Sequence, residues 1–173
     1  LADWASRHWL GSRVHFLRTA THDRVVSSIP QNNKQKHAQS ATNSLAKEAF
    51  SRGGAVVRTP PTSDDASVAI AAASQGRTLI LAPTLARTQR LAVAMKRAGI
   101  EVALYPRDWR ASAGGAVTIG TRSAAWAPIS ELDAVLVLDE HDEAYQQESA
   151  PTWHARHIAL ERARRDGARW VIT

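Results

Sequence analysis

Residues 134–138, the apolar run Ala-Val-Leu-Val-Leu, constrain the fold of this chain more than any other stretch. A short, continuous run of this kind predicts a strand that is buried on both faces of a parallel sheet. The run ends directly at Asp139, Glu140, His141 and Asp142. Because ligands of open α/β sheets bind beyond the carboxyl ends of the strands, this acidic cluster stands where a nucleotide-hydrolysing domain holds Mg²⁺. The alternative is a strand that ends in a solvated acidic loop.

From residue 55 onward the chain alternates between predicted strands and predicted helices. Strands are expected at residues 55–58, 78–82, 101–105, 116–119, 134–138 and 169–173, and helices at 66–74, 85–98 and 153–165. Glycine follows each of these helices within a few residues, as is typical of helix ends. Strand–helix alternation predicts an α/β domain over residues 55–173, with a mostly parallel sheet and helices on both faces.

The first 54 residues differ from the rest in charge and in composition. Residues 1–58 carry nine Lys or Arg against three acids, whereas residues 59–173 carry 13 of each. Residues 1–26 are predicted to be helical, with Val25 and Val26 beginning a short strand. Trp4 and Trp9 would stack on bases or, as we favour, pack on a neighbouring domain. Residues 27–54 are predicted to be a basic polar linker that contains a short helix at about 45–51. The charge asymmetry fits a segment that faces nucleic acid, or simply a basic linker.

Composition excludes several classes of protein. The chain has no cysteine, so disulfides and thiolate metal sites within it are excluded. No apolar run reaches membrane-spanning length and no signal-peptide pattern opens the sequence. The chain begins without Met and ends in a predicted strand, so we expect a segment of a longer, cytoplasmic protein.

The turn after the first predicted strand lacks the features of a phosphate-binding loop. Such a loop needs glycines, whose backbone N–H groups wrap the phosphates, followed by Lys and by Ser or Thr. Here Pro60 and Pro61 remove two backbone donors, and Asp64 and Asp65 would repel a triphosphate. One of these aspartates is better explained as the N-cap of the following helix. Two hydroxyl side chains of the turn remain as degenerate nucleotide-binding candidates, Thr62 and Ser63.

Four further stretches form a family pattern in combination: residues 81–88 (LAPTLART), 119–128 (IGTRSAAWAP), 139–147 (DEHDEAYQQ) and 153–156 (WHAR). With these motifs in this order, residues 55–173 resemble the family of primosomal protein N′, the replication-restart helicase of superfamily two. The resemblance implies a RecA-like domain of the P-loop NTPase type. It also implies that residues 1–26 are the end of the family's N-terminal DNA-binding region.

The resemblance implies eight DNA-contacting side chains. They come from the family's motif Ia, from its next DNA-contacting motif and from an aromatic-rich loop that couples DNA contact to ATP hydrolysis: Arg87; Thr121, Arg122 and Ser123; Tyr145, Trp153, His154 and Arg156. Arg122 would bind phosphates of single-stranded DNA without reading sequence, and its alternative is a surface ion pair. Tyr145 and Trp153 would be stacking platforms, and their alternative is packing of the loop on the domain.

The chain departs from the family at motif II, which is Asp-Glu-Glu-His-Asp with Tyr seven residues after its first Asp. Aligning Tyr145 places Leu138 at that Asp, and leucine cannot hold Mg²⁺. Asp139, Glu140 and His141 then form a degenerate catalytic motif, unless a one-residue slip restores Asp139 to the metal position. The family uses ATP and Mg²⁺, but no metal ligand is predicted within this chain. The family's zinc-binding cysteines would lie outside it.

Because the phosphate loop and the metal carboxylate are altered together, we expect a replication-restart protein that binds single-stranded or forked DNA with lost or weak helicase activity. Its partners would be other primosome proteins and single-strand-binding proteins, and it would associate with the nucleoid rather than with a membrane. One competing hypothesis is an active ATP-dependent 3′–5′ helicase with an unusual phosphate loop. Another is a RecA-like module that serves protein assembly alone.

Overall fold

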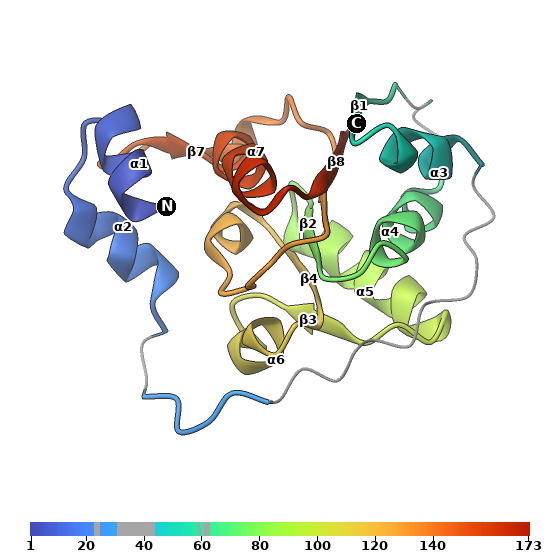
Figure 1. The fold of residues 1–173 in the computed structure, drawn as a ribbon, viewed down its shortest axis with the longest axis horizontal. Coiled ribbons are helices and arrows are strands. Elements are labelled where there is room, and N and C mark those ends of the chain that lie inside the picture. Colours follow the sequence, from blue (N-terminus) through green and yellow to red (C-terminus); the bar gives the residue numbers. More distant parts are fainter. Residues whose placement is uncertain (23–24, 31–43, 59, 61–62) are drawn as a thin grey trace.

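The computed structural model describes residues 1–22, 25–30, 44–58, 60 and 63–173 (Figure 1). Its centre is a six-stranded parallel sheet with the strand order β1-β8-β5-β2-β4-β3. In chain order these strands are β1 (Gly54–Val56), β2 (Thr78–Leu81), β3 (Val102–Leu104), β4 (Val117–Gly120), β5 (Ala134–Val137) and β8 (Arg169–Ile172). The six predicted strands are confirmed, each within two residues of its predicted ends.

β5 lies in the interior of the sheet and pairs with β2 on one side and with β8 on the other. Leu136 has Ile80 and Val171 as its neighbours in the two adjoining strands. Every residue of β5 is buried, because helices cover both faces of the sheet. The prediction of a strand buried on both faces is therefore confirmed.

Two layers of helices enclose the sheet (Figure 1). Side chains of a strand alternate between the two faces, so Ile80 and Leu136 contribute to one core and Leu79 and Val135 to the other. The first core is covered by α3 (Ser44–Ser51), α4 (Asp65–Ala73) and α5 (Leu85–Arg97). The second is covered by α7 (Ala155–Asp166), the 3₁₀ helix η1 (Arg122–Trp126), α1 (Ala2–His8) and α2 (Arg13–Ala20). The α/β fold with helices on both faces is confirmed.

Local sequence sets the helix ends. The side chain of Asp64 caps α4 by accepting a hydrogen bond from the backbone N–H of Ala66 at 3.0 Å, which confirms an aspartate as the N-cap. Thr84 caps α5 in the same way, and Gly167 ends α7 in the left-handed conformation.

None of the helices in the described part of the chain is both long and apolar enough to cross a membrane.

Two predictions of local structure are wrong. Val25 and Val26 form no strand, and both are at least partly exposed with no neighbouring strand to pair with in the described part of the chain. The predicted helix at 153–165 begins only at residue 155, because β7 (Trp153–His154) pairs antiparallel with β6 (Gln146–Gln147). The short helices α6 (Trp109–Ala113), η1 and η2 (Glu143–Tyr145) were not predicted, since each is too short to show helical periodicity.

The two N-terminal helices pack on the second core. The Phe16 side chain is fully buried, and its ring centroid lies 5.7 Å from that of Trp126 in η1. Trp9 stacks on His157 of α7 at 6.4 Å and contacts Trp4 edge-on at 5.1 Å. Packing, the alternative that we favoured for Trp4 and Trp9, is thus the arrangement in the structure.

We expect Glu161 of α7 to make stability depend on pH in the acid range. Hydrogen bonds from Arg164 and Arg165, opposed by burial, lower the pKa of the Glu161 carboxyl to about 2. A carboxyl whose folded pKa lies below its unfolded value of 4.5 stabilises the fold above that pH, and this contribution is lost as the pH falls towards 2. Because the arginines are partly exposed, Glu161→Gln should cost about 1–2 kcal/mol at pH 7. The difference in the free energy of unfolding between Glu161→Gln and wild type should shrink towards zero near pH 2.

Urea unfolding between pH 7 and pH 3 measures this effect. Glu148→Gln is the matched control, because Glu148 is exposed and the same charge is removed. A constant gap between Glu161→Gln and wild type across that pH range would contradict the prediction.

Candidate nucleic-acid interface

The carboxyl ends of three neighbouring strands, β2, β4 and β5, meet at one edge of the sheet and border an open hollow. The hollow has a volume of about 330 Å³. Its walls come from the segments that directly follow these strands: Pro83 and Leu85 after β2, Thr121, Arg122 and Ser123 after β4, and Ala144 after β5. The structure therefore brings together the three residues that the sequence predicted as one DNA-contacting motif, Thr121, Arg122 and Ser123.

The turn from β4 into η1 needs glycine at position 120. A Cβ atom there would lie 2.6 Å from the Cβ of Ala124 and 3.1 Å from the carbonyl oxygen of Tyr105. With no side chain at Gly120, η1 folds back against the strand and the backbone N–H of Ala124 donates to the carbonyl of Thr121 at 2.9 Å. This tight turn leaves Arg122 exposed at the rim of the hollow, where its guanidinium makes a long contact, 3.5 Å, to the carbonyl of Ala144. No ion pair of Arg122 is found among the described residues.

A buried arginine that sequence reasoning missed anchors the other end of η1. Arg162 of α7 donates to the carbonyl oxygen of Ala125 at 2.8 Å and to that of Ile129 at 2.9 Å. Burial lowers the pKa of Arg162 to about 10, so the guanidinium still carries its charge at neutral pH. The sequence signal for a buried arginine is its position on the apolar face of a helix. Arg162 lies four residues after Ile158 and directly before Ala163, both of which are buried.

Leu138, at the position of the family's metal-binding aspartate, lies inside the first core. Its side chain is 1% exposed, and its backbone is held by a hydrogen bond from its N–H to Leu81 at 3.0 Å. Its carbonyl oxygen accepts a hydrogen bond from the hydroxyl of Tyr145 at 2.6 Å. Among the described residues there is no group of three or more His, Asp or Glu side chains that could hold a metal ion.

The acidic residues after β5 form ion pairs instead. Asp139 adopts a left-handed backbone conformation (φ 48°) and pairs with Arg87. Arg87 also pairs with Asp65 at 2.7 Å, and these two carboxylates, against the opposing effect of burial, raise the pKa of the guanidinium. Glu140 pairs with Arg156. His141, the third residue of the degenerate motif, is exposed.

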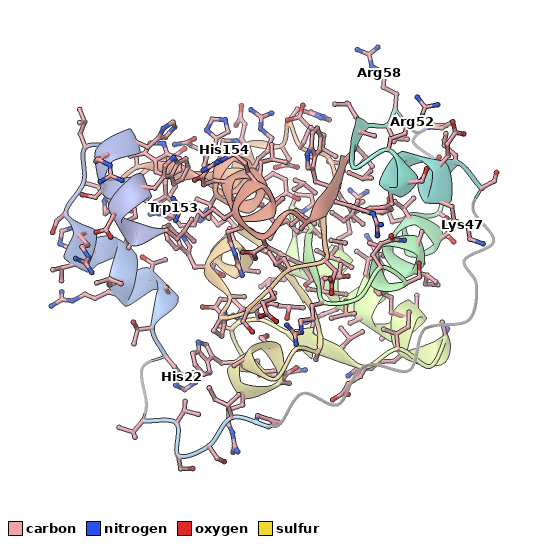
Figure 2. All side chains as sticks on the ribbon, viewed as in Figure 1. His22, Lys47, Arg52, Arg58, Trp153 and His154 are labelled. Atoms are coloured by element: carbon pink, nitrogen blue, oxygen red, sulfur yellow. The ribbon has the colours of Figure 1, made fainter. Side chains whose placement is uncertain are left out.

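The aromatic-rich loop packs on the domain. Tyr145 is fully buried and burial raises its pKa, while Trp153 is 4% exposed and meets the ring of Trp126 edge-on at 5.8 Å. His154 is half-buried, which lowers its pKa, and its Nδ1 accepts from the backbone N–H of Arg156 at 3.2 Å. Figure 2 shows Trp153 and His154 on the side of α7 that faces the N-terminal helices. Packing, the alternative to base stacking, is thus the arrangement of Tyr145 and Trp153.

The two nucleotide-binding candidates do not contribute to this hollow. Thr62 lies outside the described residues. The backbone N–H of Ser63 donates to the carbonyl of Pro60 at 2.9 Å, and Ser63 directly precedes the Asp64 cap. Ser63 is not among the residues that line the hollow.

The parallel sheet, its strand order and a ligand-sized hollow at the carboxyl ends of its strands define a RecA-like α/β domain. No family model matches the chain. It is similar to the replication restart protein PriA of Chlamydia pneumoniae, with 36% identity over 107 residues, which are 54% of this chain and 14% of that protein. PriA of Bacillus subtilis is 33% identical over 73 residues, 41% of this chain and 9% of the relative. The probable replication restart protein PriA of Mycobacterium tuberculosis is 44% identical over 59 residues, 33% of this chain and 9% of the relative.

The resemblance to the primosomal protein N′ family that the motifs predicted is therefore confirmed, since these relatives are replication restart proteins named PriA. The matched region spans 14% or less of the length of each of them.

Proposed function

We propose that this protein binds single-stranded or forked DNA in replication restart, with weak or no ATP hydrolysis. The observation that carries the proposal is the hollow beside η1, which is lined by the exposed guanidinium of Arg122 and by Thr121 and Ser123. Guanidinium and hydroxyl groups bind phosphate oxygens without reading bases, as a protein that acts at forks of any sequence requires. The names of the relatives support the replication context.

Three features argue against efficient ATP hydrolysis. The turn before α4 carries the Asp64 cap where a phosphate loop would present glycine N–H groups and lysine. Leu138 is buried where the family places its Mg²⁺ ligand. Asp139 and Glu140 form ion pairs with Arg87 and Arg156, so a metal ion would have to break both ion pairs to use these two carboxylates. The residues present therefore do not fit Mg²⁺–ATP in the manner of the family.

By the same resemblance, the partners would be other primosome proteins and single-strand-binding proteins, with the protein associated with the nucleoid. Any zinc site of the kind that the family carries would be formed by cysteines outside this chain, which has none.

We expect Arg122→Ala to weaken binding to single-stranded DNA by about tenfold and to reduce the salt slope of binding by about one charge. Fluorescence anisotropy with a labelled oligothymidine, titrated at several salt concentrations, measures both quantities. Arg52→Ala is the control, because Arg52 is exposed next to the edge strand β1, and β8, β5 and β2 lie between β1 and β4 (Figure 2). Its effect should be less than about twofold.

Two results would argue against the proposed function. Unchanged binding in Arg122→Ala, or binding that does not depend on salt, would favour a module that serves protein assembly alone. DNA-stimulated ATP hydrolysis that Glu140→Gln abolishes would favour an active helicase.

A further inference from the structure

One arginine at the edge of the hollow is shared by two carboxylates that are far apart in sequence. The Nε atom of Arg87 donates to Asp65 at 2.7 Å, and a terminal nitrogen binds Asp139. Asp65 is the first residue of α4, Arg87 lies in the first turn of α5, and Asp139 is the second residue after β5. The three side chains are between 21% and 41% exposed, so solvent and ligands can reach them.

This ion-pair group lies on the same edge of the sheet as the hollow. Leu85, in the same helical turn as Arg87, lines the hollow. The loop that starts at Asp139 reaches the hollow at Ala144, whose carbonyl is the long contact of Arg122. Arg122 and Arg87 therefore flank one loop, with Arg122 exposed and Arg87 engaged by carboxylates.

The group carries one positive and two negative charges, so it repels a polyanion as long as it stays intact. If either carboxylate moved away or lost its charge, the guanidinium would become available to a phosphate. Partly exposed ion pairs of this kind contribute only about 0–1 kcal/mol each, which is within the range that one phosphate contact can replace.

We propose that Asp65 and Asp139 set the affinity of this site for DNA by competing with its phosphates for the guanidinium of Arg87. In the free protein the carboxylates hold Arg87, and a DNA strand that already contacts Arg122 displaces one of them. This inference rests on the proposed function and adds an affinity-determining role for the two acids that form ion pairs with Arg87. A purely structural ion pair is the alternative.

A double-mutant cycle tests the competition with labelled oligothymidine at fixed salt. Asp139→Asn should tighten binding by about fivefold, because it frees one terminal nitrogen of Arg87 and removes one negative charge. Asparagine is suited to this position, since it tolerates the left-handed backbone that Asp139 adopts. In an Arg87→Gln background the same replacement should tighten binding by less than about twofold, which is the effect of the charge alone. Thermal unfolding of each variant, followed by circular dichroism, checks that the fold is intact.

Glu143→Gln is the matched control, since Glu143 is exposed in the same loop and the replacement removes the same charge without touching Arg87. Asp65→Asn is the second variant, which should tighten binding in the same direction and should also depend on Arg87. Equal gains for Glu143→Gln and Asp139→Asn, or an undiminished gain without Arg87, would overturn the inference. If one of these two results were found and Arg122→Ala still weakened DNA binding, the proposed function would stand and only the inference about Arg87 would fall. If neither the wild type nor the carboxylate variants bound DNA, both the inference about Arg87 and the proposed function would be overturned.

Discussion

Replacement of Arg162 by methionine is expected to lower the free energy of unfolding by about 2–4 kcal/mol, because two buried carbonyl groups lose their donors. Methionine fills much of the same volume and removes the cost of burying a charge, which by itself would stabilise the fold. The loss should still prevail, since the carbonyls of Ala125 and Ile129 lie at and beyond the end of η1, where Arg162 is their donor. The same change should weaken DNA binding, because η1 carries Arg122.

Urea denaturation followed by circular dichroism measures the loss of stability. Arg97→Met is the control, because Arg97 is exposed at the end of α5 and its replacement should change stability by less than about 0.5 kcal/mol. A methionine variant as stable as wild type would show that the cost of burying the guanidinium equals the gain from its two hydrogen bonds.

Phe16→Ala should destabilise the protein by about 3–5 kcal/mol, the usual cost of removing a fully buried phenyl ring from a core. The ring of Phe16 is 0% exposed and lies between Trp9 of the N-terminal segment and Trp126 of η1. Its loss would remove the main apolar contact through which α2 packs on the sheet domain. We expect α1 and α2 to detach before the sheet unfolds.

Hydrogen exchange resolved by peptide can measure this detachment, with faster exchange over residues 1–20 than over the strands. Leu17→Ala is the matched control, because Leu17 is the next residue of α2 and is 43% exposed. It should change stability by less than about 1 kcal/mol. Equal protection of residues 1–20 in Phe16→Ala and in wild type would show that other contacts hold the helices in place.

The strands could be predicted from the sequence because each is a short run dominated by apolar residues, and in β2, β4 and β5 every residue is buried. The sequence placed the N-cap of α4 at Asp64 or Asp65 and the end of α7 at Gly167, and the structure has the cap at Asp64. The order of the strands did not follow, since β1 pairs with β8, which lies more than 100 residues further along the chain. Such pairing depends on how the helices pack over the sheet, and local periodicity carries no information about it.

The candidate site was predicted in part. Thr121, Arg122 and Ser123 lie together because one tight turn presents all three. The partner of Arg87 could not be predicted, since Asp139 is 52 residues away and meets it only after β2 and β5 have paired. The burial of Tyr145 and Trp153 depends equally on long-range packing. The role of Arg162 is visible only once η1, too short to predict, is in place.

The outermost strand has a consequence for handling the protein. β1 pairs with β8 on one side only, and no strand in the described part of the chain pairs with its other side, where Val56 is 66% exposed. An open strand edge can template self-association into aggregates. Here the strand is three residues long and exposed Arg52 and Arg58 flank it, so like charges repel a second copy. Solubility should therefore fall when salt screens these two arginines or when both are replaced by neutral residues.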